Sequence, residues 1–333
     1  MSLGKIALLT IYAGLAMMAT VVNAQTAPQT VSAGRQSLDD AWWTGPMLAP
    51  SAATLPRGHF LIEPYLYDVI VQGQYDANGA RHSAPHANGF GSLTYMNYGL
   101  ANRVTVGLIP IVGYNDVSKG PSSGGVGLGD FTVQVQYRIT QFQEGHWVPT
   151  TSIALQETLP TGRYDRLGNR PSDGFGSGAY TTTLAFYSQT YFWLPNRRIL
   201  RMRFNVSPAI SSNVRLRDVS VYGTGTGFRG QAMPGSSVFV DTSWEYSLTR
   251  RWVLALDATY RHQGNTPVNG YNISSPTQPV HFDSGSSDAF GLAPAIEYSW
   301  KRNLGVLLGA RIIPAGRNAN ATISPAIAIN FVH

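Results

Sequence analysis

Segments of about ten residues alternate apolar and polar side chains along most of the chain beyond residue 58. From Phe131 to Thr140, apolar side chains occupy every odd position and polar side chains every even position. Similar alternation recurs within residues 238–248, 252–261 and 290–300. Because successive side chains of a strand point to opposite faces, each segment is predicted to form a strand with one apolar and one polar face.

This alternation predicts twelve strands, an even number of the kind that single-chain bacterial outer-membrane barrels have. We place them at residues 59–71, 90–100, 103–114, 129–140, 149–159, 179–193, 200–212, 237–248, 252–263, 288–300, 304–314 and 322–332. Five prolines fall inside these strands, where each removes a ladder hydrogen bond and is expected to need a bulge or a strand end. They are Pro64, Pro110, Pro208, Pro294 and Pro325.

The connections between the predicted strands alternate in length. Short ones lie at residues 100–102, 195–199, 249–251 and 301–303, with a longer one at 141–148, whereas long ones lie at 72–89, 115–128, 160–178, 213–236 and 264–287. Short periplasmic turns alternating with long extracellular loops are typical of membrane barrels. We therefore predict an all-β fold, a transmembrane antiparallel up-and-down β-barrel of about twelve strands with both chain ends in the periplasm.

The first 57 residues lack this alternation and divide into two parts. Lys5 precedes an apolar run from Ile6 to Val22, and the small residues at Val22 and Ala24 predict a signal peptide (residues 1–24) cleaved after Ala24. An uncleaved anchor helix is the alternative, since the run is nearly long enough to span a bilayer. Residues 25–57 are predicted to be a periplasmic N-terminal lead that anchors at the interface, covers one end of the barrel or plugs it, and residues 58–333 to be the barrel.

Composition agrees with an exported barrel. Charged residues make up 13% of the chain, about half the usual share of a soluble protein, while the chain holds 17 Tyr, 13 Phe and 7 Trp. The absence of cysteine excludes a disulfide framework, a metal-thiolate site and a Cys nucleophile. The net charge of +6 is dispersed along the chain, so no nucleic-acid partner is predicted.

Two short motifs resemble a known family. Gly127-Leu128-Gly129-Asp130-Phe131 leads into one predicted strand, and Leu159-Pro160-Thr161-Gly162 opens the following long loop. With Leu55-Pro56-Arg57-Gly58 before the first strand, they resemble the outer-membrane family named for the MetA pathway of phenol degradation. The resemblance covers most of the mature chain and implies a channel for hydrophobic or aromatic compounds, without assigning roles to residues.

The polar faces of the predicted strands carry charges of both signs. These candidate lumen charges either pair across strands and stiffen the barrel or form a weak selectivity filter. They are Glu63, Arg138, Arg201, Arg203, Asp241, Glu245, Asp257, Arg261, Glu297 and Arg311. Aromatic residues on or near the same face could instead form a path for aromatic solutes or simply pack. They are Tyr65, Tyr67, Tyr187, Tyr191 and Phe239.

Two other patterns bear on chemistry. Residues 260–265 resemble the site of outer-membrane phospholipase A, but Gly264 stands where a nucleophilic Ser is needed, so His262 has no hydroxyl to activate. His82 and His86 have a spacing that could hold a metal, but on a loop that spacing fixes no geometry. We therefore predict no catalytic residues, no metal and no cofactor.

The resulting hypothesis is an outer-membrane channel for passive uptake of small, hydrophobic or aromatic compounds. The alternatives are a structural or adhesive barrel without transport and, further off, a lipid hydrolase. The expected partners are a small-molecule solute, the barrel-assembly machinery, and outer-membrane lipid and lipopolysaccharide, whose phosphates loop arginines could bind. These arginines are Arg163, Arg166, Arg170, Arg215, Arg217 and Arg229.

Overall fold

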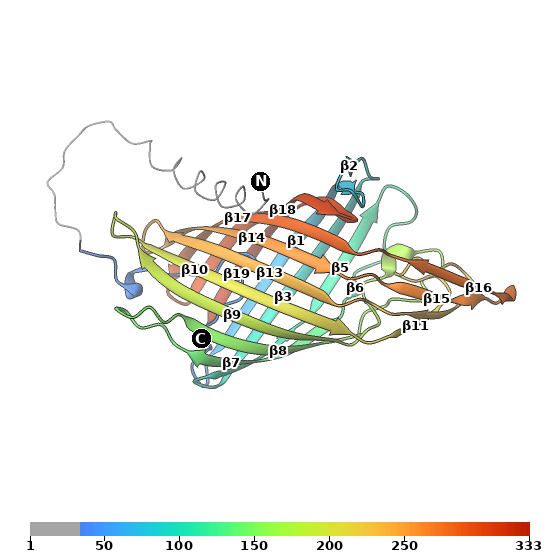
Figure 1. Ribbon diagram of the computed structural model, residues 1–333. Helices are drawn as coiled ribbons and strands as arrows, with labels where there is room; N and C mark the ends of the chain where they lie inside the picture. Colours follow the sequence, from blue (N-terminus) through green and yellow to red (C-terminus); the bar gives the residue numbers. More distant parts are fainter. Residues whose placement is uncertain (1–33) are drawn as a thin grey trace, which may run out of the picture. The chain divides into compact units, whose positions relative to one another are not determined.

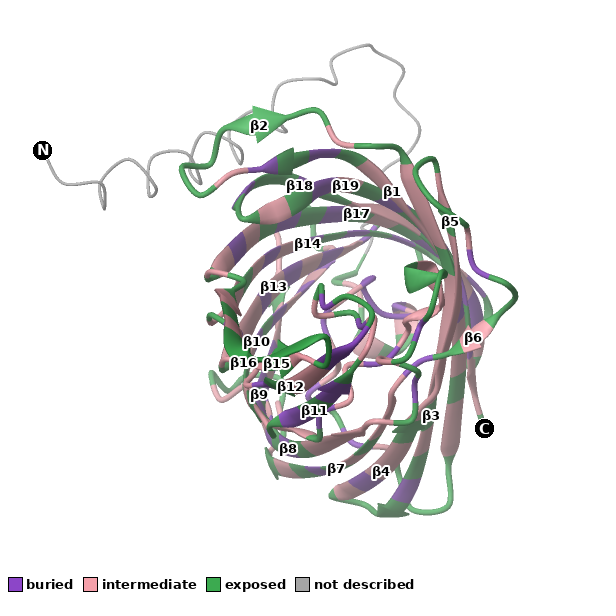
Figure 2. Cartoon of the chain, turned by 90° about the vertical axis from the view of Figure 1, so that its right-hand side faces the viewer, coloured by how far each residue is buried: buried purple, intermediate pink, exposed green. Residues whose placement is uncertain are grey.

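The computed structural model describes residues 34–333, so the expected signal peptide lies outside the described residues. Within the described part, twelve antiparallel strands close into a barrel because β1 pairs with both β3 and β19 (Figures 1 and 2). The twelve staves are β1 (Phe60–Tyr75), β3 (Ala87–Ala101), β4 (Val104–Ile109) with β5 (Ile111–Val117), β7 (Phe131–Thr140), β8 (Thr150–Leu159), β9 (Thr181–Trp193), β10 (Ile199–Ser211), β13 (Ser237–Ser247), β14 (Trp252–Gln263), β17 (Ser287–Lys301), β18 (Leu304–Arg317) and β19 (Ala319–Val332). The predicted fold and strand number are confirmed. In the same part of the chain, no helix is long and apolar enough to cross a membrane.

The barrel carries its apolar side chains on the outside. On β7, Val133 and Val135 are exposed, whereas Gln136 on the alternate face is buried in the interior. Trp252, Tyr298 and Trp300 pack together on the outer face near the short turns, with ring centroids 4.5 and 5.6 Å apart. An apolar band with aromatic residues at its edge and a polar interior is the arrangement that a lipid bilayer selects.

The strand prolines sit where a ladder is interrupted. Pro110 separates β4 from β5, as the prediction of a strand end required. At Pro64, Pro208 and Pro294, however, the pairing with one neighbouring strand skips two residues and resumes in the same register. The missing proline N–H therefore interrupts the hydrogen-bond ladder over two residues without shifting the register, and no bulge forms at these positions.

The long connections gather at one end of the barrel and carry structure that the alternation did not predict. Short strands β2 (Arg81–His82) and β6 (Gly127–Leu128) extend the barrel wall, and η2 (Pro171–Asp173) lies in the loop after β8. A separate four-stranded sheet is built from two loops. Its strands are β11 (Val214–Arg217), β12 (Phe228–Ala232), β15 (Pro267–Asn272) and β16 (Ser275–Asp283). The last connection at this end is a single residue, Asn318, with φ +47°.

Residues 36–57 precede β1 and run through the barrel interior. From here on, the lead means these residues, 36–57, of the N-terminal lead predicted at residues 25–57. It includes one short helix, η1 (Leu38–Asp40), and otherwise has no regular structure. Its contacts with inward-facing side chains show that it lies in the half of the barrel nearer the short turns.

Candidate functional site

The lead is held to one wall of the barrel by buried carboxylates. Glu297 on β17 accepts hydrogen bonds through Oε2 from the backbone N–H of Thr44 (2.8 Å) and Gly45 (3.1 Å) and from the Thr44 hydroxyl (2.9 Å). Asp257 on β14 accepts a fourth, from the backbone N–H of Leu48 at 3.2 Å. Two strands of the barrel thus bind backbone donors of a segment that has no ladder of its own.

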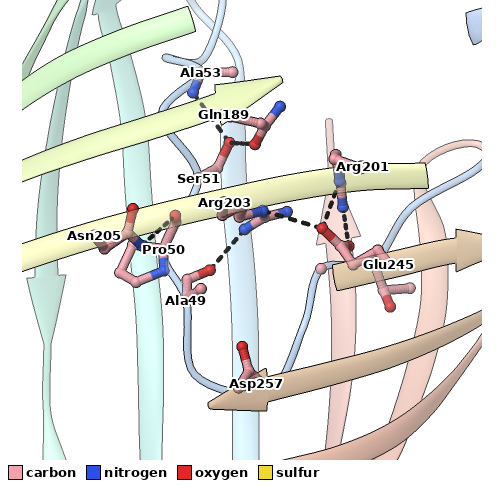
Figure 3. A network of polar contacts seen from close by, with 12 residues as sticks. Ala49, Pro50, Ser51, Ala53, Gln189, Arg201, Arg203, Asn205, Glu245 and Asp257 are labelled. Atoms are coloured by element: carbon pink, nitrogen blue, oxygen red, sulfur yellow. Dashed lines mark hydrogen bonds and ion pairs between the residues drawn. The ribbon is translucent and has the colours of Figure 1, made fainter. Parts of the chain in front are cut away.

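The lead continues across neighbouring strands, where its carbonyls accept hydrogen bonds from inward side chains (Figure 3). Arg203 donates to the Ala49 carbonyl at 2.7 Å, and Asn205 donates to the Pro50 carbonyl at 3.0 Å, both from β10. On β7, Gln136 donates to the Ser51 carbonyl at 2.9 Å. Because a polar backbone group left without a partner in an interior is costly, these contacts fix the path of the lead.

Two apolar contacts fill the space beside this hydrogen-bonded path. Met47 packs against Tyr65, Leu307 and Ala328, which belong to β1, β18 and β19. Ala52 is fully buried against Ala154, Ala185 and Tyr187 of β8 and β9. These strands lie on different sides of the closed sheet. The lead therefore crosses the lumen and obstructs the half of it that is nearer the short turns.

Both ends of the lead are fastened at the short turns. Asp40 is hydrogen bonded to Arg250, and this bond holds the pKa of the Asp40 carboxyl below its usual value. At the other end, Leu55 donates its backbone N–H to the Thr105 hydroxyl at 2.9 Å. Gly99 lies on β3, beside the point where the lead turns into β1. A side chain there would bring its Cβ to 2.0 Å from the Pro56 carbonyl oxygen, so glycine is required at this position of β3.

Four of the ten candidate lumen charges form one cluster on the barrel wall in contact with the lead. Arg201 binds Glu245 through two guanidinium nitrogens, and Arg203 approaches the same carboxylate at 3.2 Å. Arg201 and Glu245 stand directly opposite each other on β10 and β13. The fourth member, Glu297, accepts the hydrogen bonds from Thr44 and Gly45 of the lead. The members of this cluster are buried and bound to one another or to the lead backbone.

The other six candidates are more dispersed. Asp241 and Asp257 are fully buried on β13 and β14, and both lie close enough to Arg311 on β18 to interact with its charge. Arg261 lies near the outer end of β14, with its guanidinium 5.0 Å from the ring centroid of Phe239. Two lie elsewhere: Glu63 on β1 is half-buried, and Arg138 lies at the turn end of β7. The predicted inward set thus separates into a buried cluster and scattered members.

A cavity of about 620 Å³ runs along the lead inside the barrel, from residues near the short turns such as Leu61 and Asn330 to residues near the loops such as Ser237. Its floor is formed by residues 43–51 and 53–55 of the lead. One part of its wall is uncharged and carries the amides and hydroxyls of Asn97, Thr105, Thr132, Gln134, Gln136, Gln156, Thr158, Thr181, Thr183, Asn205 and Ser207. The aromatic side chains of Tyr65, Tyr95, Tyr187 and Phe239 also line it, with Glu63, Arg201, Arg203 and Arg261 as its charged residues.

The predicted inward aromatic residues do not all serve the cavity. Tyr65, Tyr187 and Phe239 line it, and Tyr65 packs edge-on against Tyr95 with centroids 6.0 Å apart. Tyr191 instead contacts Trp43 of the lead, with centroids 6.5 Å apart. Tyr67 covers Gly91 on β3, where an added Cβ would lie 2.4 Å from the Tyr67 ring. The cavity therefore combines polar side chains with apolar and aromatic surfaces.

The two family-like motifs meet each other at the outer rim. Asp130 accepts hydrogen bonds from the backbone N–H of Gly162 (2.9 Å) and of Ser177 (2.7 Å), and from the Ser177 hydroxyl (2.7 Å). The Thr161 hydroxyl donates to the Gly129 carbonyl at 2.9 Å. These motifs therefore tie the loop of residues 160–178 to the start of β7, and their role is architectural.

The remaining chemical candidates have structural partners. His262 lies 2.8 Å from Asp288, which also binds Arg317, and Gly264 donates its backbone N–H to the Ser236 carbonyl. His82 lies 2.9 Å from Asp76 in its loop. Among residues 34–333, no three His, Cys, Asp or Glu side chains gather in a way that could hold a metal.

Several loop arginines likewise hold the loops together. Arg163 donates to the Arg166 carbonyl at 2.6 Å, Arg170 to the Ser122 carbonyl at 3.3 Å, and Arg229 binds Asp218 at 3.0 Å. The bond from Arg229 lowers the pKa of Asp218. Arg215 and Arg217 are exposed on β11.

Comparison with known proteins places this barrel among outer-membrane proteins. An outer-membrane channel from Pseudomonas putida F1 superposes with a TM-score of 0.65 at 14% identity, covering 86% of this chain and all of that one. The transport unit of the autotransporter AIDA-I from Escherichia coli gives a TM-score of 0.45 at 11% identity, covering 85% of this chain and 93% of that one. A deletion mutant of TodX, a monoaromatic hydrocarbon channel, gives 0.32 at 12% identity, covering 84% and 90%. The first of these supports the barrel fold; the other two are too distant to carry an argument.

No curated protein matches the sequence. A family model does match, over residues 71–324, and that span includes both motifs at the outer rim. The chain therefore belongs to the family described as "Putative MetA-pathway of phenol degradation".

Proposed function

We propose that this protein is an outer-membrane channel for passive uptake of small compounds, among them hydrophobic and aromatic ones. The observation that carries the proposal is the cavity of about 620 Å³ enclosed by the barrel alongside the lead. A barrel of twelve strands lies between the packed eight-stranded and the open sixteen-stranded cases, so its lumen suits a narrow path.

The lining of the cavity favours small solutes of mixed character. Amides and hydroxyls can replace the water around a polar group, while Tyr65, Tyr95 and Phe239 offer ring surfaces to an aromatic one. The family is named for the degradation of phenol, an aromatic compound, which agrees with this substrate class. Conduction requires that a solute binds strongly enough to enter the cavity and weakly enough to leave it.

The proposal includes export and assembly. We propose that residues 1–24 are removed after Ala24, and that the barrel-assembly machinery inserts the mature chain into the outer membrane. We propose lipid and lipopolysaccharide as neighbours of the exposed arginines at the loop end, such as Arg215 and Arg217 on β11. A catalytic role is not proposed, because His262 binds Asp288 and its neighbour Gly264 offers no nucleophile.

Single-channel recording tests the proposal. The purified full chain is reconstituted in a planar bilayer, and conductance is recorded first in salt alone and then with aromatic and aliphatic solutes. We expect discrete openings whose current is reduced by the solute class that enters the cavity. A folded barrel without conductance would refute the proposed channel. It would favour a structural or adhesive role, for which the four-stranded sheet outside the barrel offers a surface.

A further inference from the structure

Arg261 differs from the other arginines that line the cavity. Arg201 and Arg203 are buried and both form ion pairs with Glu245. Arg261 is exposed to the lumen and, within residues 34–333, forms neither an ion pair nor a hydrogen bond. The ring centroid of Phe239 lies 5.0 Å from its guanidinium carbon, and the charge nearest to it on β18 is that of another cation, Arg311. A cation is thus presented to the cavity without a counter-charge.

The sheet fixes the position of this cation. Phe239 and Arg261 stand directly opposite each other on β13 and β14, and both line the cavity. A guanidinium held over an aromatic face gains a cation–π contact that orients it while its N–H groups keep their hydrogen-bonding capacity. The pair is therefore ordered before any solute arrives.

The nearby carboxylates of the described structure form no ion pair with Arg261. Asp241 and Asp257 interact with the charge of Arg311, and Asp257 also accepts the Leu48 N–H. Glu63 is the carboxylate that lines the same cavity, on β1, and its charge interacts with Arg203. None of these carboxylates neutralises Arg261, so an anion entering from the loop end meets an uncompensated positive charge.

Resting on the channel function proposed above, we propose that Arg261 and Phe239 form a binding site for small aromatic acids. The carboxylate accepts hydrogen bonds from the guanidinium fork, whose geometry matches it, and the ring packs against the aromatic side chains of the cavity. A neutral hydrocarbon lacks the acceptor, and a small aliphatic acid lacks the ring. The site therefore selects for both features in one solute.

Block of single-channel current by three probes tests the site. Benzoate carries the ring and the charge, benzyl alcohol the ring alone, and acetate the charge alone. We expect benzoate to block at the lowest concentration. In Arg261→Gln the half-blocking concentration of benzoate should rise about tenfold, the low end for losing a charge-assisted contact in a wet lumen. In Phe239→Leu it should rise more for benzoate than for acetate, because acetate loses only the ordering of the guanidinium.

Arg138→Gln is the matched control, because it removes an equal charge from the turn end of the barrel, away from the cavity. We expect its half-blocking benzoate concentration to stay within about twofold of the parent value. Folding of each variant is checked by the heat-dependent shift in gel mobility that folded barrels show. Equal benzoate block in the parent and Arg261→Gln would overturn the site while leaving the channel in place. Absence of conductance in the parent would instead overturn the channel.

Discussion

Glu297 is the residue whose loss should most loosen the lead. Its Oε2 atom accepts three hydrogen bonds, from the backbone N–H groups of Thr44 and Gly45 and from the Thr44 hydroxyl. A typical intramolecular hydrogen bond contributes about 1 kcal/mol net. For three bonds, Glu297→Ala should weaken docking of the lead by about 3 kcal/mol, or roughly a hundredfold in the docking equilibrium.

The absence of native cysteine makes this measurable by thiol labelling. A Met47→Cys substitution places a reporter in the lead at a site that is 8% exposed and packed against Leu307 and Ala328. In the parent background this thiol should react slowly with a water-soluble maleimide. Adding Glu297→Ala should raise the labelling rate strongly, and Glu297→Gln, which keeps a neutral acceptor, should give an intermediate rate.

Glu157→Ala is the matched control. Glu157 lies on β8, accepts a hydrogen bond from Thr182 at 2.6 Å and does not contact the lead in the described structure. Its removal should leave the labelling rate unchanged. Equal rates in the parent, Glu297→Ala and Glu157→Ala would refute the account of how the lead is held, because the reporter would then be insensitive to the largest single anchor.

Three further predictions concern the ends of the barrel. Asp130→Ala should leave the N–H groups of Gly162 and Ser177 without an acceptor, so limited proteolysis should cut residues 160–178 faster, at a cost of about 1–3 kcal/mol for each unsatisfied donor. Gly99→Ala should lower the yield of folded barrel in detergent refolding followed by gel mobility, because its Cβ would lie 2.0 Å from a backbone oxygen. The pKa of Asp40 is lowered by Arg250, so this carboxylate stabilises the docked lead above its unfolded pKa and the contribution is lost as the pH falls through the lowered value. The Met47→Cys labelling rate should therefore rise as the pH falls below about pH 4, and this rise should be absent in Asp40→Asn, after correction for the intrinsic pH dependence of the reagent.

The barrel wall could be predicted from the sequence because its physics is local. Each strand must show lipid one face and the lumen the other, so the alternation from Phe131 to Thr140 carries both the strand and its orientation. The same parity places the ten candidate charges on inward faces. Which of them pair is a different question, since the contact between Arg201 and Glu245 depends on the register of β10 against β13. Alternation within one strand does not encode that register.

The path of the lead could not be predicted for a related reason. It is held mainly through its backbone, by the N–H groups of Thr44, Gly45 and Leu48 and by the carbonyls of Ala49 and Pro50. Backbone groups are the same in every residue, so a pattern of side chains does not reveal their partners. The four-stranded sheet outside the barrel escapes prediction because its strands are short, at four to nine residues.

Flux of uncharged solutes of graded size into proteoliposomes tests the central claim most directly. The claim is that small solutes pass through a lumen that contains a cavity of about 620 Å³ and that the lead narrows beside it. Liposomes that contain the purified full chain should swell in glycerol and in a pentose but exclude a trisaccharide. Swelling indistinguishable from protein-free liposomes for every solute, or equal entry of the pentose and the trisaccharide, would contradict it.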